Sequence, residues 1–251
     1  EEGYLGELPE KSLNIFRPKK IKEALPVLVF IHGGSWRSGS KEKYSLVGRR
    51  WARRNIVAVI IDYPLSPEYK IHSMAKASAK ALNWVDENIA DYGGDPGKIV
   101  VSGHSAGGHL ASLISIREEY FDSLGVDSPI AAAVLNDAAG LDMYHYLKEK
   151  NYAPGTSHLK TFTDAPQVWK DTSPIYFLHK DMPPMFFMMG GKTYESILVG
   201  TDRFMKEYKK FVSEPNFKIQ NKRHIPMMLQ MVYTPSRGFK WVIDYVKAVG
   251  E

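Results

Sequence analysis

A serine stands between two glycines in the segment Gly103-His104-Ser105-Ala106-Gly107. An apolar run typical of a β-strand, 99–101, precedes it, and a run of small residues compatible with a helix, 106–116, follows it. A serine at so tight a strand-to-helix turn has strained backbone geometry and an exposed hydroxyl, and the flanking glycines avoid clashes with neighbouring elements. The pattern predicts that Ser105 is a nucleophile. A chance occurrence in a glycine-rich loop is the alternative.

A serine hydroxyl needs a base to take its proton and an acid to orient that base. In a parallel sheet such groups gather at the carboxyl ends of the strands. His224 follows the last predicted strand, 217–220, and stands after the serine in the order serine, acid, histidine. We therefore predict His224 as the base, whereas His104 and His109, which flank the serine, are expected to be mainly structural.

The acid is expected after the predicted strand 185–189. The carboxylates that follow this strand closely are Glu195 and Asp202. Asp202 falls inside a predicted helix, 197–212, where a solvated charge is the simpler interpretation. Glu195 lies in the preceding loop and is the predicted acid.

A second glycine-rich segment, His32-Gly33-Gly34-Ser35-Trp36, follows the apolar strand 26–32. Glycines at this point let backbone N–H groups turn toward a bound carbonyl oxygen, although an ordinary Gly-Gly turn is the alternative. The N–H groups predicted to form an oxyanion hole are those of Gly34, Ser35 and Ala106. The residues expected to line the substrate site are Gly33, Trp36 and His104.

Strands alternate with helices along the chain, which predicts an α/β fold with a mostly parallel sheet covered on both faces. Further strands are predicted at 13–18, 56–61 and 130–135, and further helices at 44–54, 73–89 and 236–249. We predict one domain, 1–251. The polar and aromatic segment 141–176 interrupts the alternation and is expected to form a lid or a pocket wall.

Composition narrows the class of protein further. The chain has 44% hydrophobic residues, a net charge of +5 and no cysteine, which excludes disulfides, a thiol nucleophile and cysteine-based zinc sites. No apolar run approaches the length of a membrane span. The excess charge, with no nucleic-acid motif beside it, favours a solvated surface over a nucleic-acid partner. The chain begins at Glu1 rather than Met, which fits a removed export signal or a trimmed start and leaves the compartment open.

Four segments together resemble the α/β-hydrolase fold. The likeness is to its esterases with a His-Gly-Gly motif, which include hormone-sensitive-lipase-like, feruloyl-esterase-like and kynurenine-formamidase-like enzymes. The segments are 26–36, 62–68, 84–96 and 103–111. The resemblance implies a serine carboxylic-ester hydrolase without a metal or an organic cofactor, and it does not fix the acyl group. Because the sequence has no large separate lid domain, we expect small or short-chain acyl or aryl esters, cleaved through an acyl-enzyme.

The chain departs from this family after the late strand. The family usually has Asp in a Gly-x-x-Asp pattern where this chain has Thr193, so Glu195 would replace it from two residues later. Three alternatives remain open. They are an arylformamidase, an esterase of polysaccharide side chains, and a non-catalytic relative that binds a ligand in the same pocket. The oligomeric state is also open.

Overall fold

Seven strands form one sheet in the part of the chain that the computed structural model describes, residues 12–233 and 235–250. The strand order is β1-β3-β2-β4-β5-β6-β7. β1 runs antiparallel to β3, and the other neighbours are parallel. The predicted mostly parallel sheet is therefore confirmed. The strands are β1 (Leu13–Phe16), β2 (Leu25–Ile31), β3 (Val57–Ile61), β4 (Gly94–His104), β5 (Ala132–Asn136), β6 (Met185–Gly190) and β7 (Asn216–Gln220).

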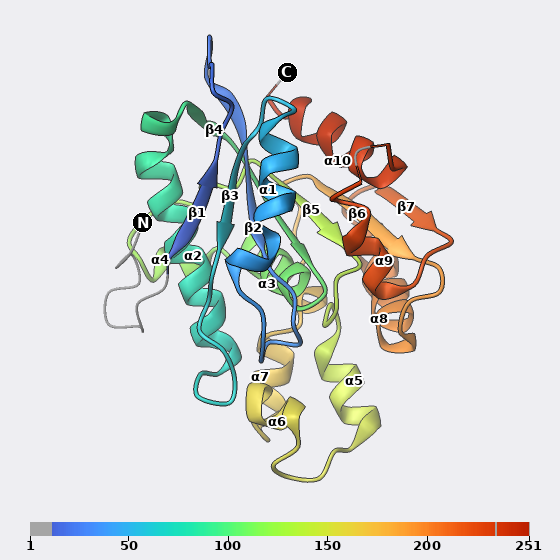
Figure 1. Ribbon diagram of the computed structural model, residues 1–251. Helices are drawn as coiled ribbons and strands as arrows, with labels where there is room; N and C mark the ends of the chain where they lie inside the picture. Colours follow the sequence, from blue (N-terminus) through green and yellow to red (C-terminus); the bar gives the residue numbers. More distant parts are fainter. Residues whose placement is uncertain (1–11, 234, 251) are drawn as a thin grey trace.

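Helices cover both faces of the sheet (Figure 1). One face packs against α1 (Ser45–Ala52), α9 (His224–Leu229) and α10 (Arg237–Lys247). The other packs against α2 (Ile71–Asn88), α3 (Ala106–Ile116) and α8 (Glu195–Tyr208). The remaining helical segments are η1 (Lys41–Tyr44), η2 (Ile89–Tyr92), α4 (Glu119–Asp122), α5 (Met143–Lys150), α6 (Ser157–Phe162), α7 (Pro166–Asp171) and η3 (Pro174–Phe177).

The apolar sequence of the interior strand β2 is explained by burial on both faces of the sheet. Val27, Val29 and Ile31 join the core beneath α2 and α3, whereas Leu28 and Phe30 join the core beneath α1 and α10. Successive side chains of a strand point to opposite faces, so a strand covered on both faces needs apolar residues at every position. The strand thereby holds the segment that follows it, 32–36, at a fixed place on the carboxyl edge of the sheet.

The structure differs from the sequence-based boundaries at two helices near the site. His224 begins a short helix, α9, that was expected to be a loop. Its third residue is Pro226, which the first turn of a helix tolerates because the N–H groups there have no intrahelical partner. Glu195 also opens a helix, since α8 starts two residues earlier than predicted. An acidic residue is favoured in a first helical turn, where the helix dipole is positive.

The segment 141–176 lies beyond the carboxyl ends of the parallel strands, where Figure 1 shows α5, α6 and α7 below the sheet. The N-cap of α5 is formed by Asp142, whose side chain accepts from the His145 N–H and pairs with Arg203 of α8 at 2.7 Å. Because Asp142 has no exposed side-chain surface, this ion pair fixes the segment firmly against α8.

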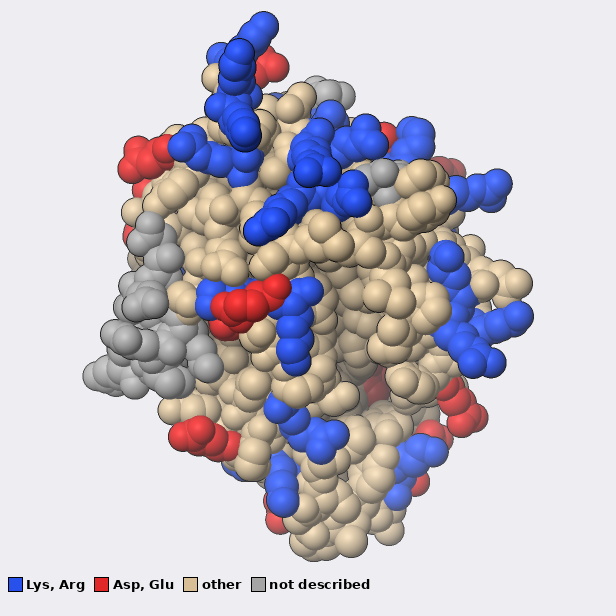
Figure 2. Space-filling model, in the orientation of Figure 1, with Lys and Arg blue, Asp and Glu red and all other residues tan. Residues whose placement is uncertain are grey.

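Lysine and arginine side chains gather at the opposite end of the molecule. Figure 2 shows them over α1 and the connection between β1 and β2, away from the hollow near the segment 141–176. Both α1 and the residues just after it are rich in arginine, namely Arg49, Arg50, Arg53 and Arg54. None of the described helices is long and apolar enough to cross a bilayer.

Candidate active site

Ser105 forms the sharp turn between β4 and α3. Its backbone has φ 57° and ψ −121°, a region that is costly for a residue with a side chain. A Cβ on Gly103 would lie 2.2 Å from the backbone of Gly107, and a Cβ on Gly107 would lie 2.0 Å from the carbonyl oxygen of Ile31. Both glycines are therefore required by close backbone approach. The strained turn expected from the motif is present.

β2 and β4 are neighbours in the sheet, although β3 separates them in the chain. The chain leaves β2 in one direction to form β3 and then crosses to the other side of β2 to form β4. Such a switch point opens a crevice at the carboxyl ends of the two strands. Gly33 follows β2 and Ser105 follows β4, so the two residues face each other across this crevice. They lie close together, because a Cβ on Gly33 would be 3.4 Å from the Cβ of Ser105.

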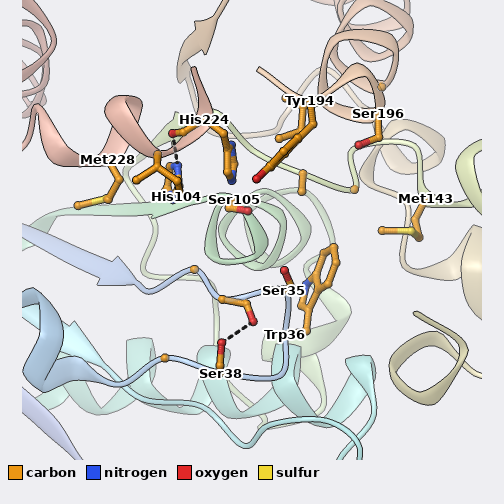
Figure 3. A pocket seen from close by; sticks show the side chains of 18 of the residues that line it. Ser35, Trp36, Ser38, His104, Ser105, Met143, Tyr194, Ser196, His224 and Met228 are labelled. Atoms are coloured by element: carbon orange, nitrogen blue, oxygen red, sulfur yellow. Dashed lines mark hydrogen bonds between the residues drawn. The ribbon is translucent and has the colours of Figure 1, made fainter. Parts of the chain in front are cut away.

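His224 lies over this serine. Figure 3 shows its ring facing the hydroxyl of Ser105. Its Nδ1 is 2.6 Å from Oδ2 of Asp137. The carboxylate accepts, so Nδ1 carries the proton in the neutral ring and Nε2 keeps a lone pair, a tautomer assigned from this hydrogen bond. The structure thus brings the predicted residues Ser105 and His224 to one site.

Asp137 directly follows β5 and is completely buried. Its φ is 50°, a conformation that aspartate tolerates better than most residues. Oδ1 accepts from the N–H of Gly190 at 2.8 Å, and Oδ2 accepts from the hydroxyl of Thr193 at 2.5 Å as well as from His224. A buried carboxylate needs such partners to offset its loss of hydration. Asp137 is held in a single orientation.

The expectation that Glu195 orients His224 is wrong, because Asp137 occupies Nδ1 of that histidine. Glu195 is the exposed first residue of α8 and lines the mouth of the pocket. Among the described residues it makes no hydrogen bond or ion pair with His224. Asp202 pairs with Lys206 at 2.7 Å on the exposed face of α8, in agreement with its interpretation as a solvated charge.

A signal for Asp137 was present in the sequence. It is the first carboxylate after the apolar strand predicted at 130–135, and β5 is the immediate neighbour of β4, which carries Ser105. The rule that functional groups follow the carboxyl ends of strands covers this position too. The predicted acid, Glu195, instead follows the next strand, 185–189.

The segment after β2 makes a turn with three consecutive positive φ angles, 132° at Gly34, 53° at Ser35 and 60° at Trp36. The carbonyl of Gly34 accepts from the N–H groups of Arg37 and Ser38, both at 3.1 Å. Within residues 12–233 and 235–250, the N–H groups of Gly34 and Ser35 themselves donate no hydrogen bond. That of Ala106 opens α3, where helical N–H groups lack intrahelical partners. These are the three donors expected to form an oxyanion hole.

Two buried histidines brace the site. Burial lowers the pKa of both His104 and His109 to about 4, so they are neutral at neutral pH. His104 donates from Nε2 to the carbonyl of His224 at 3.1 Å, with the two ring centres 4.5 Å apart. His109 donates from Nε2 to the Thr172 carbonyl at 2.7 Å and accepts from the Trp36 indole at 3.2 Å.

A cavity of about 770 Å³ opens above Ser105. Figure 3 shows Trp36, Tyr194 and Met143 around the serine, from the β2 loop, the start of α8 and the segment 141–176 respectively. The three residues expected to line the substrate site all border the cavity, although His104 contributes little surface because it is buried. They are Gly33, Trp36 and His104.

His104, Asp137 and His224 each offer one atom that could bind a metal, all within 4.8 Å of one another. Two ligands at about 2.0–2.1 Å from a tetrahedral ion lie roughly 3.3 Å apart. The 2.6 Å between Asp137 and His224 is shorter than that and is a hydrogen-bond distance. The cluster is better described as a histidine held by a carboxylate than as a metal centre.

Comparison with known proteins agrees with this geometry. The BD-FAE family matches residues 13–199. The chain belongs to the BD-FAE family. The match includes Ser105 and Asp137 but ends before His224. The role of His224 therefore rests on its position in the structure, next to these two residues.

Related proteins of known name are esterases. The chain is 37% identical over 114 residues to the carboxylesterase NlhH of Mycobacterium tuberculosis, which covers 45% of this chain and 35% of that protein. It is 32% identical over 182 residues to the esterase LipQ of the same species, covering 66% and 42%. A probable isoprenylcysteine alpha-carbonyl methylesterase of Oryza sativa is 35% identical over 120 residues, covering 48% and 29%. The matched part thus spans less than half of each relative.

Solved esterase structures share the whole fold. A Pyrobaculum calidifontis esterase covers 100% of this chain and 86% of its own, with a TM-score of 0.78 and 24% identity. A butyrate-bound esterase of Thermogutta terrifontis covers 100% and 96%, with a TM-score of 0.75 and 21% identity. The α/β-hydrolase fold and the resemblance to its esterases, both predicted from the sequence, are confirmed.

Proposed function

We propose that this BD-FAE protein hydrolyses small carboxylic esters, with short-chain acyl or aryl groups, through an acyl-enzyme on Ser105. The observation that carries the proposal is the pairing of His224 with buried Asp137 at 2.6 Å while the ring faces Ser105. Serine, histidine and aspartate in this arrangement form the constellation that activates a serine hydroxyl. The esterase names of the relatives support it.

The first half of the reaction acylates the serine. Oγ of Ser105 attacks the ester carbonyl carbon while Nε2 of His224 takes its proton. The carbonyl oxygen becomes an oxyanion that accepts hydrogen bonds from the free backbone N–H groups at 34, 35 and 106. The positive end of α3 favours the same charge. The protonated His224 then gives its proton to the departing alcohol.

The second half releases the acid. Water enters in place of the alcohol, loses a proton to Nε2 of His224 and attacks the acyl carbon. The oxyanion forms at the same donors and collapses with return of the proton to Oγ of Ser105. Asp137 stays ionised throughout and stabilises the imidazolium that forms twice in each turnover.

The cavity supports a small substrate. Its volume of about 770 Å³ is that of a small-molecule pocket. Its walls combine Trp36, Tyr146 and Tyr194 with apolar Met143 and Met228, which favours a short acyl chain or an aromatic ring over a large polar group.

The test compares the wild-type protein with Ser105→Ala on p-nitrophenyl acetate, butyrate and octanoate, with N-formylkynurenine as the substrate that would reveal an arylformamidase. We expect turnover of the short esters by the wild type and a loss of several orders of magnitude in Ser105→Ala. Equal rates in the two proteins would contradict the proposal and favour a non-catalytic, ligand-binding role. Preference for N-formylkynurenine would reassign the leaving group but keep the nucleophile.

A further inference from the structure

Thr193 lies in the turn between β6 and α8, with its hydroxyl against the His224–Asp137 pair. Its Oγ1 is 2.5 Å from Oδ2 of Asp137 and 3.4 Å from Nδ1 of His224. We propose that Thr193 is a positioning residue that holds the acid on the histidine. This inference rests on the proposed function.

The directions of the hydrogen bonds follow from the number of protons. Nδ1 of His224 has one proton, and the shorter contact of 2.6 Å assigns it to Oδ2 of Asp137. The hydroxyl of Thr193 then donates to the same oxygen, while the N–H of Gly190 donates to Oδ1. Oδ2 thus accepts from two donors and Oδ1 from one, and together they fix the plane of the carboxylate. Without the hydroxyl, the histidine would be the one remaining donor to Oδ2 among these three.

The backbone of this turn is tied to the segment that leads to His224. The N–H of Gly191 donates to the Gln220 carbonyl at 2.6 Å, and that of Lys192 donates to the Lys222 carbonyl at 3.0 Å. Lys222 is two residues before His224. These bonds fix Thr193 relative to the histidine independently of Asp137, as a positioning residue requires.

The test of this inference removes the hydroxyl of Thr193. Thr193→Val keeps the size of the side chain and should lower kcat about 10- to 100-fold with little change in KM, the range expected for one hydrogen bond to a charged group. Thr193→Ser should restore most of the activity. The acidic limb of the pH profile should move to higher pH in Thr193→Val, since Oδ2 of Asp137 then presents more charge to the imidazolium.

Thr201→Val is the matched control. Thr201 is a buried threonine of α8 that borders a different cavity, so the substitution should leave kcat and the pH profile unchanged. A Thr193→Val protein with wild-type kcat and an unmoved pH profile would overturn the positioning role. A fall in melting temperature with unchanged kinetics would overturn it as well, because that result indicates a purely structural contact.

Ser105→Ala separates this inference from the proposed function. If Ser105→Ala stays active, the proposed function fails, whereas an inactive Ser105→Ala with a wild-type-like Thr193→Val leaves that function standing and removes only the inference.

Discussion

The Nδ1 atom of His224 lies 2.6 Å from Oδ2 of Asp137, although 87 positions separate the two residues in the chain. Asp137 follows β5 and His224 follows β7, and β6 lies between these strands in the sheet. The last residue of β6 supplies the Gly190 N–H, and the turn after β6 supplies the Thr193 hydroxyl, to the same carboxylate. Three successive strands of one sheet therefore determine how the histidine is oriented.

This relationship predicts unequal effects for two carboxylates. Asp137→Asn should lower kcat about 10³- to 10⁴-fold, because the amide no longer selects the tautomer or stabilises the imidazolium. Glu195→Gln, an exposed residue at the pocket mouth, is the matched control and should stay within about threefold of wild type. Ester hydrolysis by both purified variants checks this. A large loss in Glu195→Gln with an active Asp137→Asn would contradict the assignment.

Alanine substitutions at two glycines should change the stability of the protein in opposite directions. Gly107→Ala places a Cβ 2.0 Å from the carbonyl of Ile31, so it should lower the free energy of unfolding by about 3 kcal/mol or prevent folding. A Cβ on Gly200, within α8, meets nothing closer than 3.9 Å. Gly200→Ala should therefore raise the free energy of unfolding by about 0.5–1 kcal/mol through helix propensity. Urea unfolding of both variants measures these changes, and equal effects would contradict the close approach.

Trp36 couples the oxyanion loop to the segment 141–176. Its indole donates to His109, which donates in turn to Thr172, and its ring packs on Phe162 with centres 5.0 Å apart. Trp36→Phe leaves Nδ1 of His109 buried without a donor, so unfolding should become easier by about 1–3 kcal/mol and KM should rise. Trp241→Phe, on α10 at the other face, is the control. Similar losses in the two variants would contradict the coupling.

The buried histidines predict acid sensitivity. In the folded protein the pKa of His104 and that of His109 are lowered by burial to about 4, whereas the ordinary value is 6.5. The unfolded chain therefore binds protons at higher pH than the folded chain, and acid favours unfolding. Stability should fall as pH drops below about 6.5, by about 2 kcal/mol for each histidine between about pH 7 and pH 5.

Urea unfolding at these two pH values measures this loss, and His109→Gln should reduce it because one of the two histidines is removed. A free energy of unfolding that stays constant over the range, or that rises as the pH falls, would contradict neutral burial of these rings.

The strands and turns that surround the site are predicted well from the sequence, because local patterns determine them. The apolar runs of β2 and β3, the strand-to-helix change at Ser105 and the glycines after β2 depend on neighbouring residues, and each element is found where the pattern places it. The boundaries near Glu195 and His224 are less well predicted, since short helices there depend on packing and on favourable first-turn residues.

Local patterns make Asp137 a candidate acid but do not distinguish it from the carboxylates after the next strand, because that choice depends on which strands are neighbours. Asp137 and Thr193 follow different strands and are far apart in the sequence. Their contact of 2.5 Å forms only when the sheet is assembled. The strand order places β5 between β4 and β6, and this order brings Asp137 to His224. Glu195 is near in sequence to the expected position, but it is an exposed residue at the start of α8.

The most direct test of the account is to trap the acyl-enzyme. The protein is mixed with excess p-nitrophenyl acetate, quenched in acid within the first turnovers, digested and analysed by mass spectrometry. We expect the mass of one acetyl group on the peptide that contains Ser105, located at Ser105 by fragmentation and absent from Ser105→Ala. Turnover of the ester with the acetyl group on another residue, or undiminished turnover by Ser105→Ala, would contradict the central claim that Ser105 is the nucleophile.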